Sequence, residues 1–378
     1  MSLSSPTPIR LTNLPSLVWD LSKNDIPTFV LPNTAFGIAS AIVAPALTYY
    51  PESPRIGPLL VQCTPWILLF NWSNLLVFNL ANQRLADSIQ KDRVNKPWRP
   101  LPRGRITPTQ ATRFLLGAVP VVNAELGAVR ESAGIVILAW KYNDLRGGDE
   151  LTRDPIIAIA YTIFNVSSLQ IAVGSASAKV LEFTTTGYCW LGMIAGMILT
   201  TMQVQDLKDQ RGDWARGRKT WPLVMGDRLS RRWIAGSVNG WSLAAVGFWN
   251  VSVYLSVGVV LLGAWVGSSV VLGTGDGRTW RWCLWQCCSL HFACLENLEW
   301  TFNVAGERGI RSNHTTVLAG KHSGGPAWMG SRDSHRLAHQ LSERFCIIGL
   351  WCIDKGLEVG GTKNPLQVLN VPNHRIEV

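Results

Sequence analysis

Apolar residues occur in long runs through much of the chain, and short polar stretches separate the runs. A helix needs roughly 20 mostly apolar residues to cross a bilayer. Four runs come close to or exceed that length, at residues 29–50, 59–80, 155–174 and 187–204. The pattern predicts an all-α protein that crosses a membrane several times, with residues 29–272 as its transmembrane domain.

Weaker apolar runs lie between and after these four. Residues 233–272 are long enough for two spans with a turn near residues 247–250. Residues 111–126 and 134–142 are weaker candidates, and the second reaches a spanning length only if its helix extends into neighbouring residues. With or without these two candidates, an even number of spans precedes residue 205.

Two polar loops therefore emerge on the same side of the membrane. The first, ANQRLADSIQKDRVNKPWRPLPRGRITPTQ, follows the second span, and the other is QDLKDQRGDWARGRKTW. Residues 81–112 hold seven Lys and Arg and residues 205–232 hold eight, against one in residues 51–58. Because Lys and Arg are enriched in cytoplasmic loops, we expect both loops and the N-terminal segment, residues 1–28, to be cytoplasmic. We expect this membrane to be that of the endoplasmic reticulum.

The composition fits a membrane protein better than a nucleic-acid-binding one. Only 16% of the residues are charged, against about 25% in soluble domains. The net charge of +10 comes largely from residues between apolar spans, which favours the lipid bilayer or an anionic substrate as partner over nucleic acid. The start of the chain lacks a charged stretch followed by an apolar core, so we expect no secretory signal peptide.

Acidic and basic side chains gather in both polar loops. Asp206, Asp209 and Asp213 are spaced i, i+3 and i+7, which places them on one face if the preceding helix continues. The first loop offers further oxygen ligands, and both loops offer cations. Carboxylate and amide oxygens suit Mg²⁺, which shares its coordination with phosphate oxygens, whereas Arg and Lys bind phosphate directly. The combination predicts a diphosphate head bound in the loops, with an apolar tail among the helices.

Such a site can support chemistry that water would quench. When Mg²⁺ neutralises a diphosphate leaving group, an allylic C–O bond can ionise. Aromatic faces can stabilise the resulting cation by roughly 0.5–2 kcal/mol each. The candidate aromatic residues are Trp66, Phe70, Phe78, Tyr161, Phe164, Tyr188, Trp190 and Trp241. The alternative is that the charged loops are only a solvated face and the aromatic residues only packing.

Two motifs resemble the UbiA-type intramembrane prenyltransferase superfamily. DLKDQRGDWARGRKTWPLVMG resembles its second aspartate-rich motif, and DRVNKPWRPLPRGRIT resembles the end of its first. The resemblance covers residues 25–272. It implies a UbiA-like bundle of about seven to nine transmembrane helices around a central cavity, capped by loops that bind Mg²⁺ and an isoprenyl diphosphate. The superfamily's third loop corresponds to residues 140–150, where Lys141, Tyr142 and Arg146 are weak candidates for diphosphate contact.

The first motif departs from the superfamily pattern. If Asp92 is its last aspartate, the usual first Asn falls on Arg84 and the usual middle Asp on Ser88. The chain instead offers Asn82, Asp87 and Asp92 at steps of five residues. Five residues turn an α-helix by about 500°, so these three share a face only if the helix bulges or unwinds.

This altered motif resembles the fungal branch of membrane-bound UbiA-type terpene cyclases. The resemblance implies a sesquiterpene cyclase of fungal secondary metabolism, a lyase that ionises farnesyl diphosphate with Mg²⁺ and cyclises the cation to a hydrocarbon. By resemblance, Asp92, Asp206 and Asp213 are catalytic. The implied metal ligands are Asn82, Asp87, Asp92, Asp206, Asp209 and Asp213. The expected diphosphate-binding residues are Arg93, Lys96, Arg99, Arg218 and Lys219.

Two other functions remain open at this point. A UbiA-type aromatic prenyltransferase shares the ionisation step, and a non-catalytic binder or transporter of isoprenoid phosphates needs the same headgroup site. Residues 273–378 do not show the further apolar spans that the resemblance implies, so this region is either divergent or the product of a gene-model error. A zinc site at Cys283, Cys287, His291 and Cys294 is not expected, because one helix cannot wrap a tetrahedral ion.

Overall fold

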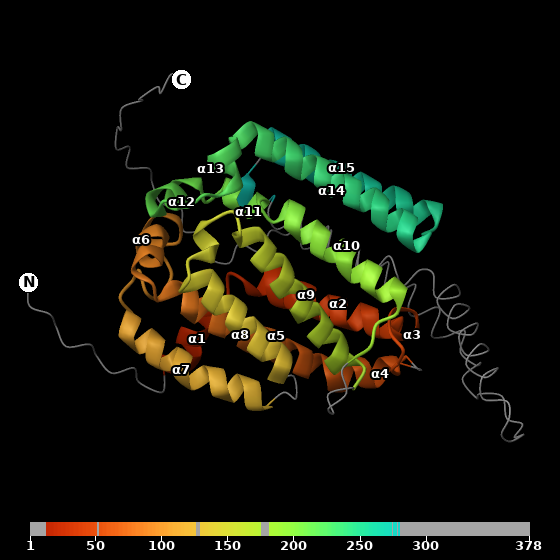
Figure 1. The fold of residues 1–378 in the computed structure, drawn as a ribbon, viewed down its shortest axis with the longest axis horizontal. Helices are drawn as coiled ribbons and strands as arrows, with labels where there is room; N and C mark the ends of the chain where they lie inside the picture. Colours follow the sequence, from red (N-terminus) through yellow and green to blue (C-terminus); the bar gives the residue numbers. More distant parts are fainter. Residues whose placement is uncertain are drawn as a thin grey trace, which may run out of the picture.

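The computed structural model describes residues 13–50, 53–125, 129–174, 181–273, 275–277 and 279. These residues form a helical bundle, with one isolated antiparallel bridge between Thr48 and Phe183 (Figure 1). The predicted all-α fold is confirmed. The expectations for Cys283, Cys287, His291, Cys294 and nearly all of residues 273–378 lie outside the described residues.

The helices follow one another along the chain with short connections. In order they are α1 (Leu14–Ser22), η2 (Ile26–Val30), α2 (Leu31–Ile42), α3 (Ala44–Leu47), α4 (Ile56–Pro58), η3 (Leu59–Cys63), α5 (Thr64–Gln83), α6 (Ala86–Asn95), α7 (Pro108–Glu125), α8 (Val129–Asn143), η4 (Gly147–Asp149), α9 (Arg153–Ala172), α10 (Thr185–Thr201), α11 (Val204–Leu207), α12 (Gln210–Arg216), α13 (Trp221–Met225), α14 (Asp227–Trp249) and α15 (Val253–Leu272). Here η2 and η3 are π-helical turns and η4 is a 3₁₀ turn.

Within the described ranges, four helices are long and apolar enough to cross a membrane: Ile56–Gln83, Arg153–Ala172, Thr185–Leu207 and Val253–Leu272. The predicted turn near residues 247–250 is also present, because α14 ends at Trp249 and Asn250 adopts a left-handed conformation. The first span was predicted at residues 29–50, and its predicted end at residue 50 is wrong. The continuous apolar helix there is Ile26–Ile42, and a separate short helix, α3, follows it.

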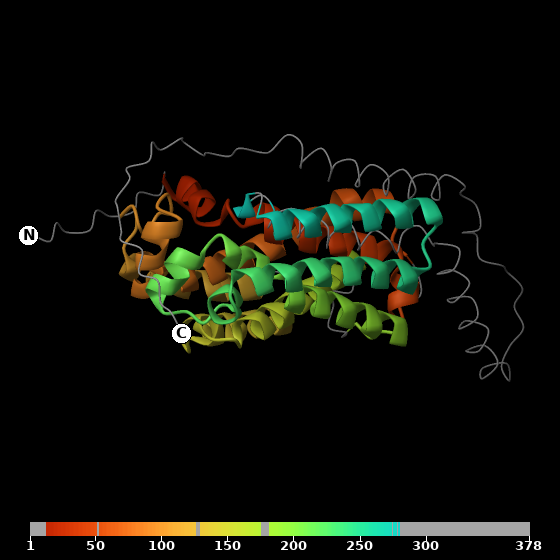
Figure 2. The same ribbon diagram turned by 90° about the horizontal axis from the view of Figure 1, so that it is seen from above.

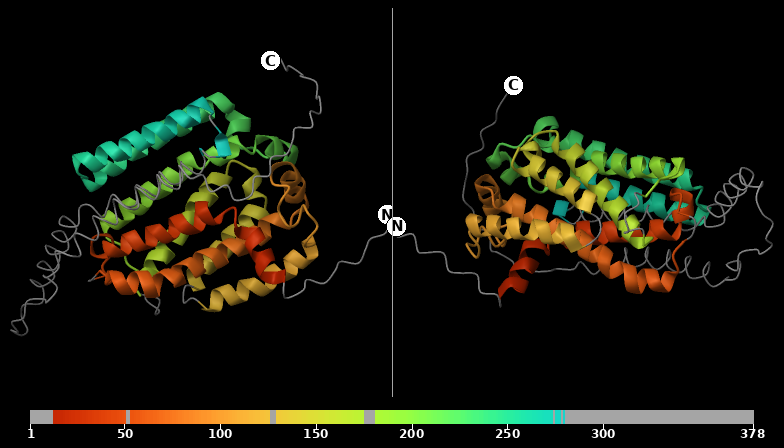
Figure 3. Two further views of the ribbon diagram at one scale, coloured as in Figure 1. Left: turned by 180° about the vertical axis from the view of Figure 1, so that it is seen from behind. Right: turned by 60° about the horizontal axis from the view of Figure 1, so that its bottom comes forward.

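The central helices pack through small residues that allow close approach. α9 contacts α2, α5, α8 and α10, so it lies at the centre of the bundle. The Cα of Gly37 on α2 lies so close to Ser168 on α9 that a Cβ would stand 2.6 Å from the serine Cβ. The α14–α15 pair packs outside α10 (Figures 2 and 3). The bundle therefore has a tight core and one peripheral helical pair.

The two polar loops lie at the same end of the bundle, as the sequence predicts. α6 from the first loop packs against α12 from the second (Figure 1). Asn95 donates from Nδ2 to the backbone oxygen of Asp209 at 3.0 Å. A Cβ on Gly212 would lie 2.3 Å from Asn95 Nδ2, so any larger residue here would displace the asparagine side chain from this contact. The two loops are thus one packed unit.

The helix before the second loop does not continue through the three aspartates. It ends at Thr201, resumes as α11 and breaks again before α12. The condition under which Asp206, Asp209 and Asp213 would share one helical face is therefore not met. Each of the three contacts a different cation instead: Arg153, Lys208 and Arg218.

We predict that Gly187→Ala destabilises the bundle. A Cβ at this position would lie 1.9 Å from the Leu47 backbone oxygen, and such overpacking costs about 1–3 kcal/mol. The midpoint of thermal unfolding in detergent should fall. The matched control is Gly192→Ala on the same helix, where a Cβ meets nothing within 4 Å. Equal midpoints for the two variants would contradict the close contact between α3 and α10.

Candidate active site

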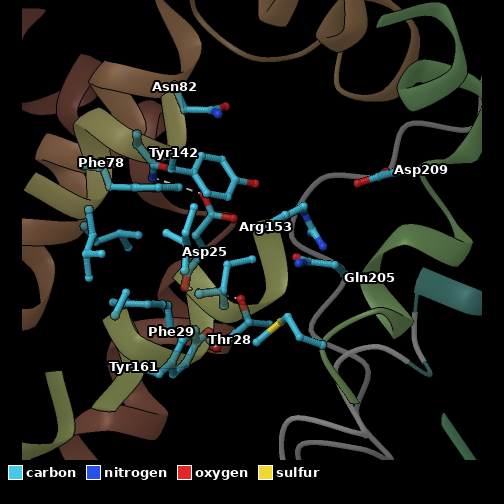
Figure 4. A pocket seen from close by; sticks show the side chains of 18 of the residues that line it. Asp25, Thr28, Phe29, Phe78, Asn82, Tyr142, Arg153, Tyr161, Gln205 and Asp209 are labelled. Atoms are coloured by element: carbon cyan, nitrogen blue, oxygen red, sulfur yellow. Dashed lines mark hydrogen bonds between the residues drawn. The ribbon is translucent and has the colours of Figure 1, made fainter. Parts of the chain in front are cut away.

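A cavity of about 160 Å³ opens among η2, α5, α8 and α9 beneath the two loops (Figure 4). On each helix the lining residues change from polar to apolar with depth. On α5, Asn82 and Asn79 lie nearer the loops and Leu75 lies deeper. On α9, Arg153 opens the helix, whereas Phe164 lies three turns further along. The cavity is therefore amphipathic, with a charged end at the loops and an apolar end inside the bundle.

Basic residues outnumber acidic ones at the charged end. The basic lining residues are Lys91, Lys96, Arg99, Arg153 and Arg218, and the acidic lining residues are Asp25, Asp206 and Asp209. An excess of positive charge in a partly enclosed space attracts anions. The charged end is therefore complementary to an anionic group.

Arg153 is held by two carboxylates. Its Nη1 donates to Asp154 Oδ1 at 2.7 Å and to Asp206 Oδ2 at 2.8 Å. Gln203 steadies the far oxygen of Asp154 by donating from Nε2 at 2.9 Å. All these side chains are buried. The network thus joins the start of α9 to the segment between α10 and α12.

Every nitrogen of the Arg218 guanidinium is directed toward a partner. Nη1 donates to Asp213 Oδ1, Nη2 to the Tyr142 hydroxyl oxygen and Nε to Asp149 Oδ1, each at 3.1 Å. Asp213 is fully buried, and Lys91 Nζ also lies 3.6 Å from its Oδ1. The guanidinium is therefore fixed by three different segments of the chain at the cavity wall.

Arg99 connects the first loop to the N-terminal segment. Its Nη1 donates to Asp92 Oδ2 at 2.7 Å, and its Nη2 lies 3.5 Å from Asp25 Oδ2. Asn79 donates to the same Asp25 oxygen at 3.1 Å and to the Leu21 carbonyl at 3.1 Å. The segment at residues 1–28, expected to lie outside the transmembrane domain, thus supplies part of the cavity wall.

The loop lysines have weakened basicity. Burial lowers the pKa of Lys96 to about 7, with a further contribution from the Arg99 charge. Burial likewise lowers the pKa of Lys91 to about 8, reinforced by Arg218 and opposed by Asp213. Asp209 behaves in the opposite way: burial alone would raise its pKa, but the charges of nearby lysines, Lys96 first among them, outweigh burial and lower the pKa. Asp209 is therefore a carboxylate at neutral pH.

Aromatic rings line the apolar end. Phe29 contacts Tyr161 and Phe164 edge to face, with ring centroids 4.7 Å and 4.5 Å apart. Phe78 and Tyr142 make a similar contact at 5.2 Å nearer the loops, where the Tyr142 hydroxyl accepts from Arg218. All five residues line the cavity. The deep end therefore presents several ring faces and edges to whatever occupies it.

Six of the residues predicted from the sequence meet at this cavity: Asn82, Lys96, Arg99, Asp206, Asp209 and Arg218. Asp92 and Asp213 lie directly behind the wall. Each of these two has one buried oxygen without a hydrogen-bond partner, Oδ1 of Asp92 and Oδ2 of Asp213. The first and second aspartate-rich segments therefore contribute to one site.

Three other predicted site residues lie elsewhere. Asp87 is 41% exposed and pairs with Arg146 at 2.6 Å. Lys219 is 61% exposed and pairs with Glu150 at 2.9 Å, and Arg93 is exposed. The helix does unwind after Asn82: α5 ends at Gln83, and Leu85 is extended before α6 begins. That break does not turn Asp87 into the cavity, so its role as a metal ligand stays a prediction that its placement does not favour.

Some of the aromatic candidates, and one of the candidates in residues 140–150, line the cavity, whereas the others lie elsewhere. Phe78, Tyr161, Phe164 and Tyr142 line the cavity. Trp66 and Tyr188 are exposed on the bundle surface, whereas Phe70 and Trp190 are buried in the core. Trp241 packs against α10, where its indole donates to Thr200 at 2.8 Å. Lys141 and Arg146 do not line the cavity.

Three charged residues of the cavity wall were not predicted from the sequence: Asp25, Lys91 and Arg153. Lys91 was counted only toward membrane topology, and Arg153 lies immediately before an apolar run, where basic residues are common. A usable signal for Arg153 is the adjacent Asp154, because an Arg–Asp pair opening a spanning helix indicates a buried ion pair. Asp25 has a weaker signal, since it is an acidic residue just before the first apolar helix.

Comparison with known proteins shows the family to which this chain belongs. The model of the UbiA prenyltransferase family matches residues 38–290. The chain is 30% identical over 234 residues to the fumagillin beta-trans-bergamotene synthase of Aspergillus fumigatus, which covers 61% of this chain and 73% of that protein. It is 24% identical over 307 residues to a diterpene cyclase of Hericium erinaceus, covering 78% and 92%.

Among solved structures, a UbiA homolog from Archaeoglobus fulgidus bound to GPP and Mg²⁺ aligns with a TM-score of 0.45 and 13% identity, covering 89% of this chain and 99% of that chain. The family match includes most of the helices that line the cavity and both polar loops. The chain is a multi-pass membrane protein and belongs to the UbiA prenyltransferase family.

Proposed function

We propose that the protein is a membrane-bound terpene cyclase that ionises an isoprenyl diphosphate, with farnesyl diphosphate as the expected substrate. The observation that carries the proposal is the amphipathic cavity beneath the two loops. Its charged end has five basic side chains, and its apolar end is lined by aromatic rings. A substrate with a diphosphate head and a long unsaturated tail has the same division of polarity.

The charged end can hold a diphosphate because its arginines are already oriented. Arg153 and Arg218 are fixed by buried partners before any ligand binds. Preorganised donors lose little conformational freedom on binding, and guanidinium groups make paired hydrogen bonds to phosphate oxygens. Lys96 and Arg99 add positive charge on another wall of the same space.

The residues present fit Mg²⁺. Asp206, Asp209 and Asn82 offer oxygens to the cavity, and Asp92 and Asp213 each have a buried oxygen without a partner. In the described part of the chain, no three His, Cys, Asp or Glu residues form a metal cage by themselves. Mg²⁺ commonly takes one or two carboxylates and completes its coordination with substrate phosphates and water. When bound, Mg²⁺ would neutralise negative charge on the leaving diphosphate.

The proposed reaction begins with cleavage of the allylic C–O bond. The electron pair leaves with the diphosphate, and an allylic cation remains in the apolar end. A double bond of the same chain attacks the cation and closes a ring, and loss of a proton then forms a new double bond. Rings such as Phe29 and Phe164 lie where they can stabilise positive charge, by roughly 0.5–2 kcal/mol each. The products are a cyclic hydrocarbon and diphosphate.

Two of the relatives favour cyclisation over transfer to an acceptor. One is a beta-trans-bergamotene synthase and another a diterpene cyclase, and the second matches 92% of its own length. By this resemblance the expected product is beta-trans-bergamotene or a similar sesquiterpene. The family also contains prenyltransferases, so transfer of the same cation to an aromatic acceptor is the second candidate. We further propose that both loops face the cytoplasm from the endoplasmic reticulum membrane.

One assay separates the candidate functions. Microsomes containing the protein are given farnesyl diphosphate and Mg²⁺ without an acceptor, and volatile products and free diphosphate are measured. A Mg²⁺-dependent hydrocarbon is the expected result. Turnover that requires an added phenol would identify a prenyltransferase instead, and binding without diphosphate release would identify a binder or transporter.

We predict that Asp206→Ala and Asp92→Ala each lower turnover at least about 100-fold, the scale seen when a group that stabilises developing charge is removed. Asp206 lines the cavity, whereas Asp92 holds Arg99 from behind the wall. The control is Glu150→Gln, which removes an exposed carboxylate paired with Lys219 and should change turnover less than twofold. Wild-type rates for Asp206→Ala would remove the headgroup assignment.

The activity should also depend on the charge of Lys96. Because its pKa is lowered to about 7, the ammonium form is present below pH 7 and is lost as the pH rises. We predict that kcat/KM, which reports the free enzyme, falls as pH rises above 7. Loss of one charge-assisted hydrogen bond should lower kcat/KM about tenfold.

The control for this pH effect is Lys96→Arg, because arginine stays protonated in this pH range. The kcat/KM of this variant should stay flat to about pH 7.5 and fall only at higher pH, where Lys91, with a pKa of about 8, loses its proton. The same decline in Lys96→Arg as in the wild type would show that another group titrates.

A further inference from the structure

The outward side of the first aspartate-rich segment contacts the other loops instead of the cavity. Arg84 Nη2 donates to Asp144 in the loop after α8. Arg146 in the same loop donates from Nη2 to Asp87 Oδ2 at 2.6 Å. Ser88 Oγ accepts from Nη1 of Arg216 on α12. Arg84, Asp87 and Ser88 do not line the cavity, so each of them serves a contact between loops.

Asp149 ties the same loops together from the other side. Its Oδ1 lies 2.7 Å from Arg216 Nε and accepts from Arg218 Nε at 3.1 Å. Its Oδ2 accepts from Arg216 Nη2 at 3.3 Å. Its backbone oxygen accepts from the Lys219 amide at 2.8 Å. One carboxylate thus holds two arginines, of which Arg218 lines the cavity and Arg216 reaches the first loop.

The backbone around Asp149 is shaped for this contact. Arg146 adopts a left-handed conformation with φ 58° and is followed by the 3₁₀ turn Gly147–Asp149. A Cβ on Gly148 would lie 2.5 Å from the Tyr142 ring, so the turn packs directly on the tyrosine that accepts from Arg218. The turn therefore positions both the ring and the carboxylate that contact Arg218.

We propose that seven residues form a polar lock that joins the three loops and sets Arg218 at the cavity wall: Arg84, Asp87, Ser88, Asp144, Arg146, Asp149 and Arg216. On this proposal Asp87 acts in loop assembly and is not a metal ligand. Asp149 is a positioning residue, because it acts through Arg218. The catalytic consequence rests on the proposed function, whereas the assembly of the loops does not.

Burial separates the centre of the lock from its rim. The side chains of Arg216 and Asp149 are 2% and 12% exposed, so removal of Asp149 leaves a buried guanidinium without its charge partner, which is strongly unfavourable. Arg146 and Asp87 are 69% and 41% exposed, and such surface pairs contribute little individually. The strongest effect is therefore expected at Asp149, and the rim is tested by charge reversal rather than by deletion.

The central test is Asp149→Asn. We expect kcat/KM to fall about 30-fold, mainly through a higher KM for the isoprenyl diphosphate, while the half-saturating Mg²⁺ concentration stays the same. Asp149→Glu, which keeps the charge, should recover part of the loss. The control is Glu150→Gln, the neighbouring exposed carboxylate, with kcat/KM within twofold of the wild type. A wild-type kcat/KM for Asp149→Asn would overturn the positioning role.

A second measurement needs no catalysis. Hydrogen exchange of the substrate-free protein should become faster in α6 and α12 in Asp149→Asn and remain unchanged in Glu150→Gln. Unchanged exchange in Asp149→Asn would overturn the lock. If the wild-type protein releases no diphosphate, the proposed function fails, and this measurement still decides whether the lock exists.

The role of Asp87 is tested by exchanging a pair of charges. Asp87→Arg places two guanidinium groups against each other, and we expect turnover to fall about 3- to 10-fold. Adding Arg146→Asp restores the pair with reversed charges and should return turnover to within about twofold of the wild type. A metal ligand cannot be replaced in this way. A double variant that stays as impaired as Asp87→Arg, with a higher Mg²⁺ requirement, would assign Asp87 to the metal and overturn this part of the lock.

Discussion

Charges withdrawn from water at the edge of a membrane protein must be paired, and this constraint organises the charged end of the cavity. Each lining arginine is held by two carboxylates that come from different parts of the chain. The sets are Arg153 with Asp154 and Asp206, Arg218 with Asp149 and Asp213, and Arg99 with Asp92 and Asp25. An unpaired buried charge costs several kcal/mol, so these pairings fix which segments must meet. The result is that both polar loops, the loop after α8 and the N-terminal segment converge on one space.

The same pairings connect stability to the proposed chemistry. Three of the carboxylates that hold the arginines, Asp92, Asp206 and Asp213, are also the proposed ligands of Mg²⁺, so the headgroup would enter a site whose donors and acceptors are already in place. Among the side chains that line the cavity, basic ones outnumber acidic ones, so positive charge faces the space where an anion would bind. Below this charged end, aromatic rings line the cavity. A site with this division stabilises a leaving diphosphate at one end and shelters a cation at the other.

The sequence predicted the spanning helices and the meeting of the two loops because both depend on long, regular signals. The apolar runs have the length of a bilayer, and the parity of spans places both loops at one end. It did not predict Asp25 or Arg153, because single charged residues at helix ends resemble topology signals. The direction of the Asp87 side chain could not be predicted from the sequence either. It depends on a backbone break after Gln83 and on a partner, Arg146, 59 residues away in a different loop. The sequence placed the three aspartates of the second loop on one face only if the preceding helix continued, and it breaks after Thr201 and again after Leu207.

The most direct measurement is a structure of the protein bound to Mg²⁺ and an unreactive farnesyl diphosphate analogue. The headgroup is expected in the cavity beneath α6 and α12, in contact with Arg153 and Arg218, with the tail passing Phe29 and Phe164. A headgroup bound instead in the exposed groove beside Lys141 and Lys219, or a tail lying outside the helices, would contradict the convergence of paired charges on a single catalytic space.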